Sequence, residues 1–180
     1  MALPVTDSWT SGTTQSIDAY GSYAVLEGAL GVINGSAGVA VTSGAYNTAR
    51  RTDETPGDDQ YSQVVITANQ ITFGIYAGPA ARCQSGANTS YHCETAGSDF
   101  YVSKCVAGSQ TVLAGPISQT FAAGDVMRLE VSGTGATVTL RVYRALAASP
   151  TSFTQVGSDY TDTAGDRITT AGYLLSLIHI

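Results

Sequence analysis

Acidic residues on predicted strands are the first place to look for catalysis in this sequence. Glycoside hydrolysis needs two carboxylates facing each other across the scissile bond, about 5–5.5 Å apart for retention or about 6.5–9.5 Å apart for inversion. Two acids at alternate positions of one strand would share a face, but Glu27, Glu94 and Glu130 each stand alone. The negative charge of Glu130 is expected to compensate the positive charges of Arg128 and Arg141 on the solvent-exposed face of a hairpin. The chain is therefore predicted not to be an enzyme, with a glycoside hydrolase as the less favoured reading.

A nucleophile and base could be supplied only by His92, next to Cys93, and no third, orienting group is suggested. His92 is interpreted as a surface residue of a strand. The three cysteines, Cys83, Cys93 and Cys105, are an odd number, which argues against a disulfide framework. They are predicted to be buried thiols, with a Cys83–Cys93 bridge across a hairpin as the alternative, and their spacing matches no zinc site.

Tyrosine and arginine side chains are the candidates for binding. Flat aromatic rings and planar polar groups are what sugars need, because rings stack on sugar faces and guanidinium groups hydrogen-bond adjacent hydroxyls. Tyrosines also fill sheet surfaces without any ligand, and the chain has 10 of them. The candidates for a ligand-binding face of one sheet are Arg82, Tyr91, Tyr101, Arg128, Arg141 and Tyr143.

The densest acidic cluster lies around Pro56-Gly57. Calcium prefers hard oxygen ligands in a flexible loop, so Asp53, Asp58 and Asp59 are candidate calcium ligands. The alternative is an ordinary solvated turn in which aspartates cap the backbone. No other cofactor is predicted.

The elements that must position these residues are read from hydrophobic alternation, which is strongest over residues 124–144. Met127, Leu129 and Val131 alternate with polar residues, and so do Val138, Leu140 and Val142 after a Gly-Thr-Gly turn. A period of two buries one face of each strand. The segment is predicted to form a hairpin at the centre of the fold, with Leu129 opposite Leu140 and all six apolar side chains on one face.

The rest of the chain repeats short apolar alternations between Gly, Ser, Asn and Asp clusters, and no segment keeps a helical period. The predicted fold is all-β: an antiparallel β-sandwich of about a dozen strands in two sheets. A chain of 180 residues fits a single domain, expected to span residues 1–174 and to be truncated at its C-terminal strand.

The charge and composition of the chain exclude some classes of binding partner. The net charge is -6 and the arginines are scattered, so no basic footprint for nucleic acid or for an anionic membrane surface exists. Only 12% of the residues are charged, so Ser, Thr, Gly, Gln and Asn must build much of the surface. No apolar run has the length of a transmembrane helix and no signal peptide is visible at the first residues. A virion or extracellular setting is the expectation, with retention in the cell or a missing start as alternatives.

Several short motifs occur in a defined order: Asp7-x-Trp9, Glu27-Gly28-Ala-Leu, Asp58-Asp59-Gln60-Tyr61, Gly78-x-x-x-Arg82, Tyr91, the strand from Phe100 to Gly108, and Gly124-Asp125-x-x-Arg128-Leu-Glu-Val-x-Gly133. This order resembles the concanavalin A-like lectin/glucanase jelly rolls, particularly laminin-G-like modules of bacterial and phage proteins. The resemblance covers roughly residues 5–174. It implies a jelly-roll sandwich, and the glucanases among these proteins carry paired strand acids that are missing here.

Fold and side chains together predict a non-catalytic binding module for carbohydrate or a cell-surface polymer. The alternative is an architectural domain of a phage tail or surface protein with no small ligand. Residues 175–180, Leu-Ser-Leu-Ile-His-Ile, are predicted to be a non-native tail. They look like translated sequencing-adapter sequence, and an apolar end of this kind invites edge pairing.

Overall fold

The computed structural model describes residues 15–16, 23–27, 30–33, 36–40, 46–51, 56–66, 76–86, 88–96 and 98–179. Within these ranges every regular element is a strand, and none of the described residues forms a helix that could cross a membrane. The strands are β1 (Gln15–Ser16), β2 (Tyr23–Glu27), β3 (Leu30–Ile33), β4 (Ser36–Ala40), β5 (Tyr46–Arg51), β6 (Gln60–Val65), β7 (Tyr76–Cys83), β8 (Ser90–Ala96), β9 (Asp99–Val106), β10 (Ser109–Ser118), β11 (Val126–Ser132), β12 (Val138–Ala145), β13 (Thr154–Asp162) and β14 (Tyr173–His179).

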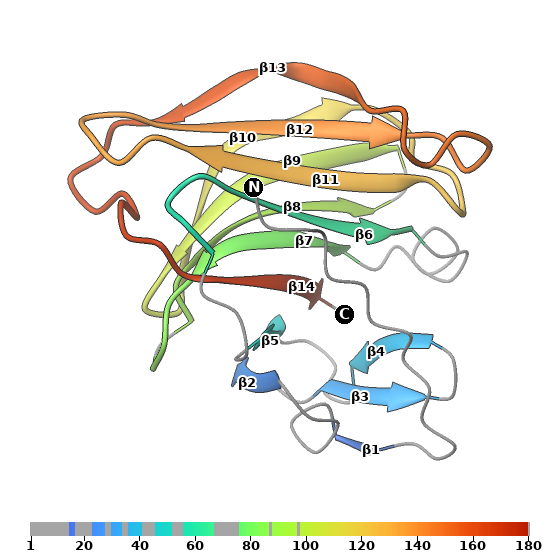
Figure 1. Ribbon diagram of the computed structural model, residues 1–180, viewed down its shortest axis with the longest axis horizontal. Coiled ribbons are helices and arrows are strands. Elements are labelled where there is room, and N and C mark those ends of the chain that lie inside the picture. The colour runs from blue at the N-terminus through green and yellow to red at the C-terminus, as the bar shows by residue number, and fades with distance from the viewer. Residues whose placement is uncertain are drawn as a thin grey trace.

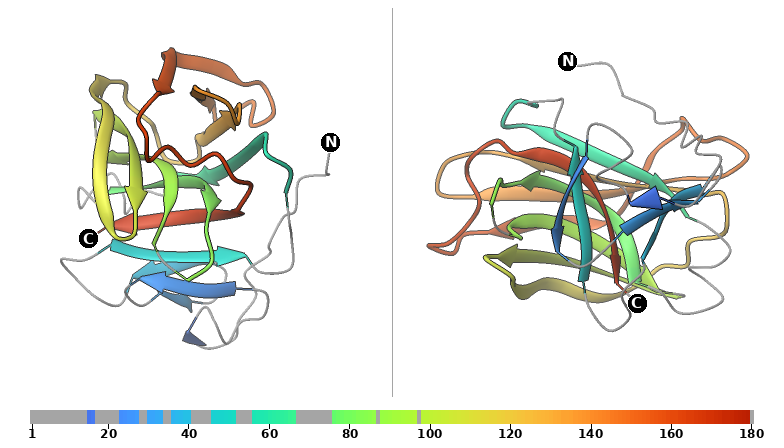
Figure 2. Two further views of the ribbon diagram at one scale, coloured as in Figure 1. Left: turned by 90° about the vertical axis from the view of Figure 1, so that its left-hand side faces the viewer. Right: turned by 90° about the horizontal axis from the view of Figure 1, so that it is seen from below.

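Two antiparallel sheets form the sandwich. One has four strands in the order β13-β12-β11-β6, and the other has the order β10-β9-β8-β7-β14-β5-β2. Figure 1 shows β8 to β10 behind β11 and β12, and views turned by 90° separate the two layers (Figure 2). A third, small sheet has the order β1-β3-β4.

The all-β, antiparallel sandwich is confirmed, but the predicted dozen strands in two sheets is too many. The sandwich whose side chains the structure describes consists of β6 to β13, four strands facing four. Of the remaining strands, β14, β5 and β2 continue the larger sheet beyond β7. The other three, β1, β3 and β4, form the small sheet. Alternation along the chain shows where a strand is, but it does not show which sheet the strand joins.

The predicted central hairpin is present as β11 and β12, the two inner strands of the four-stranded sheet. Leu129 lies opposite Val142, and Val131 lies opposite Leu140. The register therefore differs by two residues from the predicted Leu129–Leu140 pair, because residues 133–137 make a longer connection than the predicted turn. A shift of two keeps every side chain on its predicted face.

The core fills the space between the sheets. The apolar alternation of β11 and β12 supplies fully buried side chains to it, and β9 supplies others from the opposite sheet. The ring of Phe100 packs edge-on against that of Phe121, with centroids 6.3 Å apart. The main core residues of these strands are Phe100, Val102, Met127, Leu129, Val131, Val138, Leu140 and Val142.

The cysteines behave as buried thiols. All three lie in the described part of the chain and are buried without forming a disulfide, so the prediction of buried strand thiols is confirmed and the alternative Cys83–Cys93 bridge is not formed. Burial raises the pKa of the Cys93 thiol well above its usual range.

Strand β14 contains most of the predicted non-native tail. It pairs antiparallel with β5 on one side, from Leu175 opposite Arg50 to His179 opposite Tyr46. On the other side it pairs with β7. A native terminal strand would pair in this way, and so would adapter-derived sequence with the same alternation of apolar residues. The pairing therefore does not distinguish the two origins. The non-native origin of residues 175–180 and the domain span of residues 1–174 stay predictions.

Candidate functional site

The six predicted binding residues do not share one face. Two of them are inside the sandwich, one lies on the outer side of the seven-stranded sheet, and three lie on the outer side of the four-stranded sheet. In that order they are Arg82 and Tyr91, then Tyr101, then Arg128, Arg141 and Tyr143.

Arg82 is a buried clamp rather than a binding residue. Its side chain is 0% exposed, and its backbone has a φ of 54°, in the left-handed region. Nε and Nη2 donate to the carbonyl oxygen of Asp58 at 3.1 and 2.7 Å. Nη2 also donates to Gly133 O at 2.8 Å, and Nη1 donates to Ile168 O at 2.7 Å. The guanidinium joins three separate segments, so its predicted place on an open face is wrong.

Tyr91 is also buried, in a polar network beneath the loop that follows β13. Its hydroxyl donates to Asp162 Oδ2 at 2.7 Å and accepts the N–H of Ile168 at 2.9 Å. Burial, together with the hydrogen bond to Asp162, raises the pKa of Tyr91. Lys104 Nζ lies 3.1 Å from Asp162 Oδ2 and 2.6 Å from Asp166 Oδ1. Tyr91 therefore holds the loop to the sheet and is unavailable to a ligand.

Tyr101 lies on the outer side of the seven-stranded sheet. Its ring centroid is 5.9 Å from that of Tyr76, and the two rings are tilted by 58°. The ring also packs over Gly115, where an added Cβ would lie 2.5 Å from Tyr101 Cδ1. Tyr101 is thus separated from the other exposed candidates by the thickness of the sandwich.

A buried polar cluster lies on the same outer side, on β8, β9 and β10. Gln110 Nε2 is 3.1 Å from Glu94 Oε1 and 3.3 Å from His92 Nε2. Because the amide donates, we assign the His92 proton to Nδ1. His92 Nδ1, Glu94 Oε2 and Ser103 Oγ are all buried without a hydrogen-bond partner. Burial lowers the pKa of His92 to about 4 and raises that of Glu94.

His92 was interpreted above as a surface residue, and that is wrong: the side chain is 2% exposed. Its strand, β8, lies between β7 and β9 inside the sheet, and the side chain of Gln110 from β10 reaches its ring. A place on a strand therefore did not predict the exposure of this side chain.

The outer side of the four-stranded sheet, which we call the open face, carries two rows of polar and aromatic side chains. In the first row, successive Cα partners across β6, β11, β12 and β13 are Gln63, Arg128, Tyr143 and Gln155. In the second row, Tyr61, Glu130 and Arg141 are Cα partners, and Asp159 of β13 reaches Arg141 through its side chain.

Arg128 is the centre of the open face. Its Cζ lies 3.5 Å from the ring centroid of Phe153 and 4.6 Å from that of Tyr61. Nε and Nη2 donate to Gln63 Oε1 at 3.1 and 2.9 Å, and Nη1 lies 3.7 Å from Glu130 Oε1. Guanidinium groups stack on aromatic rings through cation–π attraction. The stack holds two rings and a row of hydrogen-bonding groups in one arrangement.

A β-bulge in β13 aims Asp159 at Arg141. Leu140 pairs with Tyr160 and Val142 with Val156, so residues 157–159 bulge out of the ladder. Arg141 Nε and Nη2 donate to the two oxygens of Asp159 at 2.9 and 2.6 Å. The hydrogen bond from Arg141 lowers the pKa of Asp159, so this carboxylate is ionised at neutral pH.

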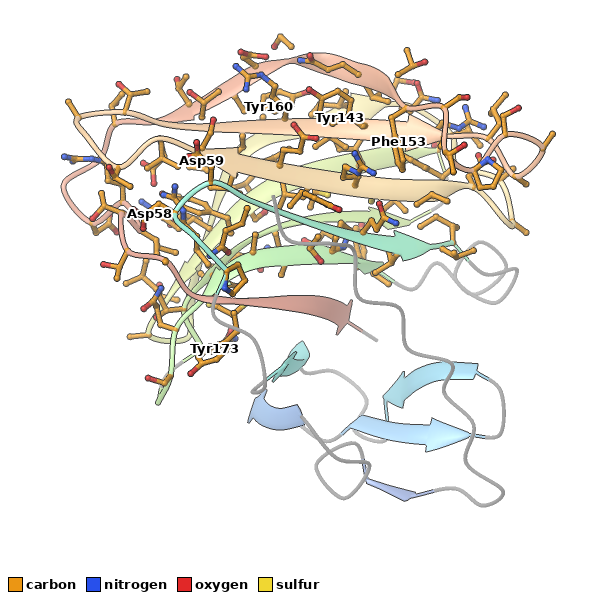
Figure 3. The ribbon with its side chains drawn as sticks, viewed as in Figure 1. Asp58, Asp59, Tyr143, Phe153, Tyr160 and Tyr173 are labelled. Atoms are coloured by element: carbon orange, nitrogen blue, oxygen red, sulfur yellow. The ribbon has the colours of Figure 1, made fainter. Side chains whose placement is uncertain are left out.

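Tyr143 completes the open face from β12. It is half-buried, and Figure 3 shows it with Phe153 over the four-stranded sheet. Burial, followed by the neighbouring Glu130 carboxylate, raises the pKa of Tyr143. The phenol therefore stays protonated and can both donate and accept a hydrogen bond.

Several open-face residues were missed from the sequence. Tyr61 and Gln63 alternate with buried residues of β6, so the same period that identified Arg128 could have found them. Phe153 and Asp159 carried no local signal, because a connecting segment and a bulge bring them to the face.

The acidic turn holds the backbone in place. Asp58 Oδ1 accepts the N–H of Ala171 at 3.1 Å, and Asp59 Oδ1 accepts the N–H of Gly133 at 3.0 Å. Both lie at the opposite end of the sandwich from Phe153 (Figure 3). The third candidate, Asp53, lies outside the described residues, among which no group of three metal-binding side chains is gathered.

Calcium at this turn stays a prediction with a direct test. If Asp53, Asp58 and Asp59 bind the ion, adding calcium should raise the melting temperature, since a ligand that binds only the folded state stabilises it. A chelator should reverse the rise. Equal melting temperatures with calcium and with chelator would contradict the prediction.

Comparisons with known proteins bear on the fold. No protein-family model and no curated protein matches the sequence. Among solved structures, the fold is similar to that of the carbohydrate binding module CBM66 from Bacillus subtilis. The match has a TM-score of 0.56 at 12% sequence identity and covers 87% of this chain and 86% of that one. At this identity the likeness shows a shared β-sandwich fold.

Proposed function

We propose that the chain is a non-catalytic carbohydrate-binding module and that the open face is its binding surface. The observation that carries the proposal is the pair of rows across β6, β11, β12 and β13, where amide, guanidinium, carboxylate and phenol groups lie beside aromatic rings. Sugars present hydroxyls that both donate and accept, and C–H faces that stack on rings. The open face offers each of these partners, and the fold shared with a carbohydrate-binding module supports the same conclusion.

The carboxylates of the open face are poorly suited to hydrolysis. A glycosidase needs one carboxyl that holds a proton as general acid and a second that acts as nucleophile or base. Asp159 forms a two-point ion pair with Arg141, and Glu130 Oε1 lies 3.7 Å from Arg128 Nη1. Both carboxylates are engaged by cations, which supports binding without catalysis.

Replacing Tyr143 with alanine should abolish most glycan binding. The variant loses the central ring of β12 and a hydroxyl that both donates and accepts. Truncating an aromatic anchor at the centre of a binding surface typically weakens affinity about tenfold or more. The measurement is a glycan array with the wild-type chain, followed by titration of the best glycan with wild type and variant.

Tyr101 provides the matched control, because it is another half-buried strand tyrosine but lies on the opposite sheet. Tyr101→Ala should bind as wild type does. Equal losses in both variants would place the binding surface elsewhere. If the folded wild-type chain binds no glycan on the array, the proposal fails and the architectural alternative is favoured.

A further inference from the structure

We infer that the open face takes an uncharged polysaccharide, bound over several sugar units of a chain that crosses the strands from β6 to β13. The inference rests on the proposed function and adds the class of ligand and its direction. It follows from three properties of the open face: the pairing of its charges, the net charge of the molecule, and the extent of its two rows.

The charges of the open face are paired with one another. Arg141 is bound at two points by Asp159, whose other neighbour is Gln155 Nε2 at 2.9 Å. Arg128 lies near Glu130 on the other side of the face. An anionic sugar would have to compete with Asp159 for Arg141, whereas a hydroxyl can accept from the remaining guanidinium N–H groups and donate to the carboxylate at once.

The whole molecule also disfavours an anionic polymer. Its net charge is -6, with 14 acidic residues against 8 basic ones. Long-range repulsion would slow the approach of a uronate or sulfated chain, and the two open-face arginines are the only cations of the rows to oppose it. A neutral chain meets no such barrier.

The two rows are longer than one sugar. Neighbouring strands lie about 4.8 Å apart, so the four strands span about 14 Å from β6 to β13. The rings of Tyr61 and Phe153 both lie against the Arg128 guanidinium, inside this span. Polar side chains mark its two ends, Gln63 on β6 and Gln155 on β13. The polar groups of β11 and β12 lie between them.

The backbone across β6, β11 and β12 is an even pleat, and the bulge of the sheet lies in β13. β11 pairs with β6 and with β12 without a register shift. Groups repeated from strand to strand in this way can contact successive sugars of a chain. Contacts spread over four strands should therefore be filled one after another as the ligand lengthens.

The test is a glycan array that carries neutral and anionic glycans of graded length, followed by titration. We expect binding to neutral glycans, with affinity rising about tenfold or more from the monosaccharide to the longer oligosaccharides. Tyr61→Ala and Gln155→Ala, at opposite ends of the rows, should each weaken the longer oligosaccharides and leave the shortest bound ligand unchanged.

A charge variant tests the ligand class independently. Asp159→Asn removes the partner of Arg141, so it should raise binding to uronate glycans relative to wild type. Asp99→Asn, on the opposite sheet, is the matched control and should leave the selectivity unchanged.

The outcomes separate the inference from the proposed function. Preferential binding of uronate or sulfated glycans by the wild-type chain, or affinity that does not change with length, would overturn the inference while the binding module stands. Binding to no glycan would overturn both.

Discussion

Replacing Arg82 with leucine should lower the free energy of unfolding by about 3–5 kcal/mol, because the carbonyls of Asp58, Gly133 and Ile168 lose their donors inside the protein. Water cannot replace the guanidinium where the side chain is 0% exposed. Arg82→Lys should recover only part of the loss, because a compact ammonium group cannot donate to three separate carbonyls as the planar guanidinium does. Urea denaturation measures the differences.

Arg141→Leu is the matched control, because Arg141 is partly exposed and its ion pair with Asp159 lies at the surface. Surface pairs contribute at most about 1 kcal/mol, so this variant should unfold close to wild type. Equal stability of the Arg82→Leu and Arg141→Leu variants would show that the buried clamp contributes nothing, contrary to the structure.

The second large effect is a dependence of stability on pH through His92. Burial lowers its pKa from 6.5 to about 4, so between these values the unfolded chain binds a proton that the folded chain does not. Stability from this residue is therefore complete above pH 6.5 and falls as the pH drops toward 4. At 1.36 kcal/mol per pKa unit, the full loss is about 3 kcal/mol.

His92→Asn should remove this loss, so the variant should lose less stability than wild type when the pH falls from 6.5 to 4. Denaturation at both ends of this range measures the difference. An identical pH dependence in variant and wild type would contradict burial of a neutral imidazole.

Glu94→Gln is the companion variant, because the pKa of Glu94 is raised and its contribution has the opposite sign. The folded chain holds this proton after the unfolded chain has released it, so stability from Glu94 falls as the pH rises above the unfolded value. In the Glu94→Gln variant the free energy of unfolding should therefore rise more steeply with pH than in wild type. A shallower gain would contradict the raised pKa.

Alternation in the sequence was sufficient to predict the sheet faces of the central hairpin. Arg128, Arg141 and Tyr143 were expected on the wet side of residues 124–144, and all three lie on the open face. The side-chain period of a strand is two, so this conclusion survives a register that differs by two residues. The all-β class followed from the same period and from the turn residues between strands.

What covers each sheet face, and which side chains lie beside it, depends on how distant segments of the chain pack together. Arg82, Tyr91 and His92 lie on β7 and β8, where other segments of the chain bury them, and no local pattern records those neighbours. The partners that complete the open face come from a different strand for Tyr61, from a connecting segment for Phe153 and from a bulge for Asp159. The strands of the central hairpin and their two faces could be predicted from local sequence, because a strand's periodicity is local. The binding surface required the fold, because it is assembled from segments that meet only when the sheets have paired.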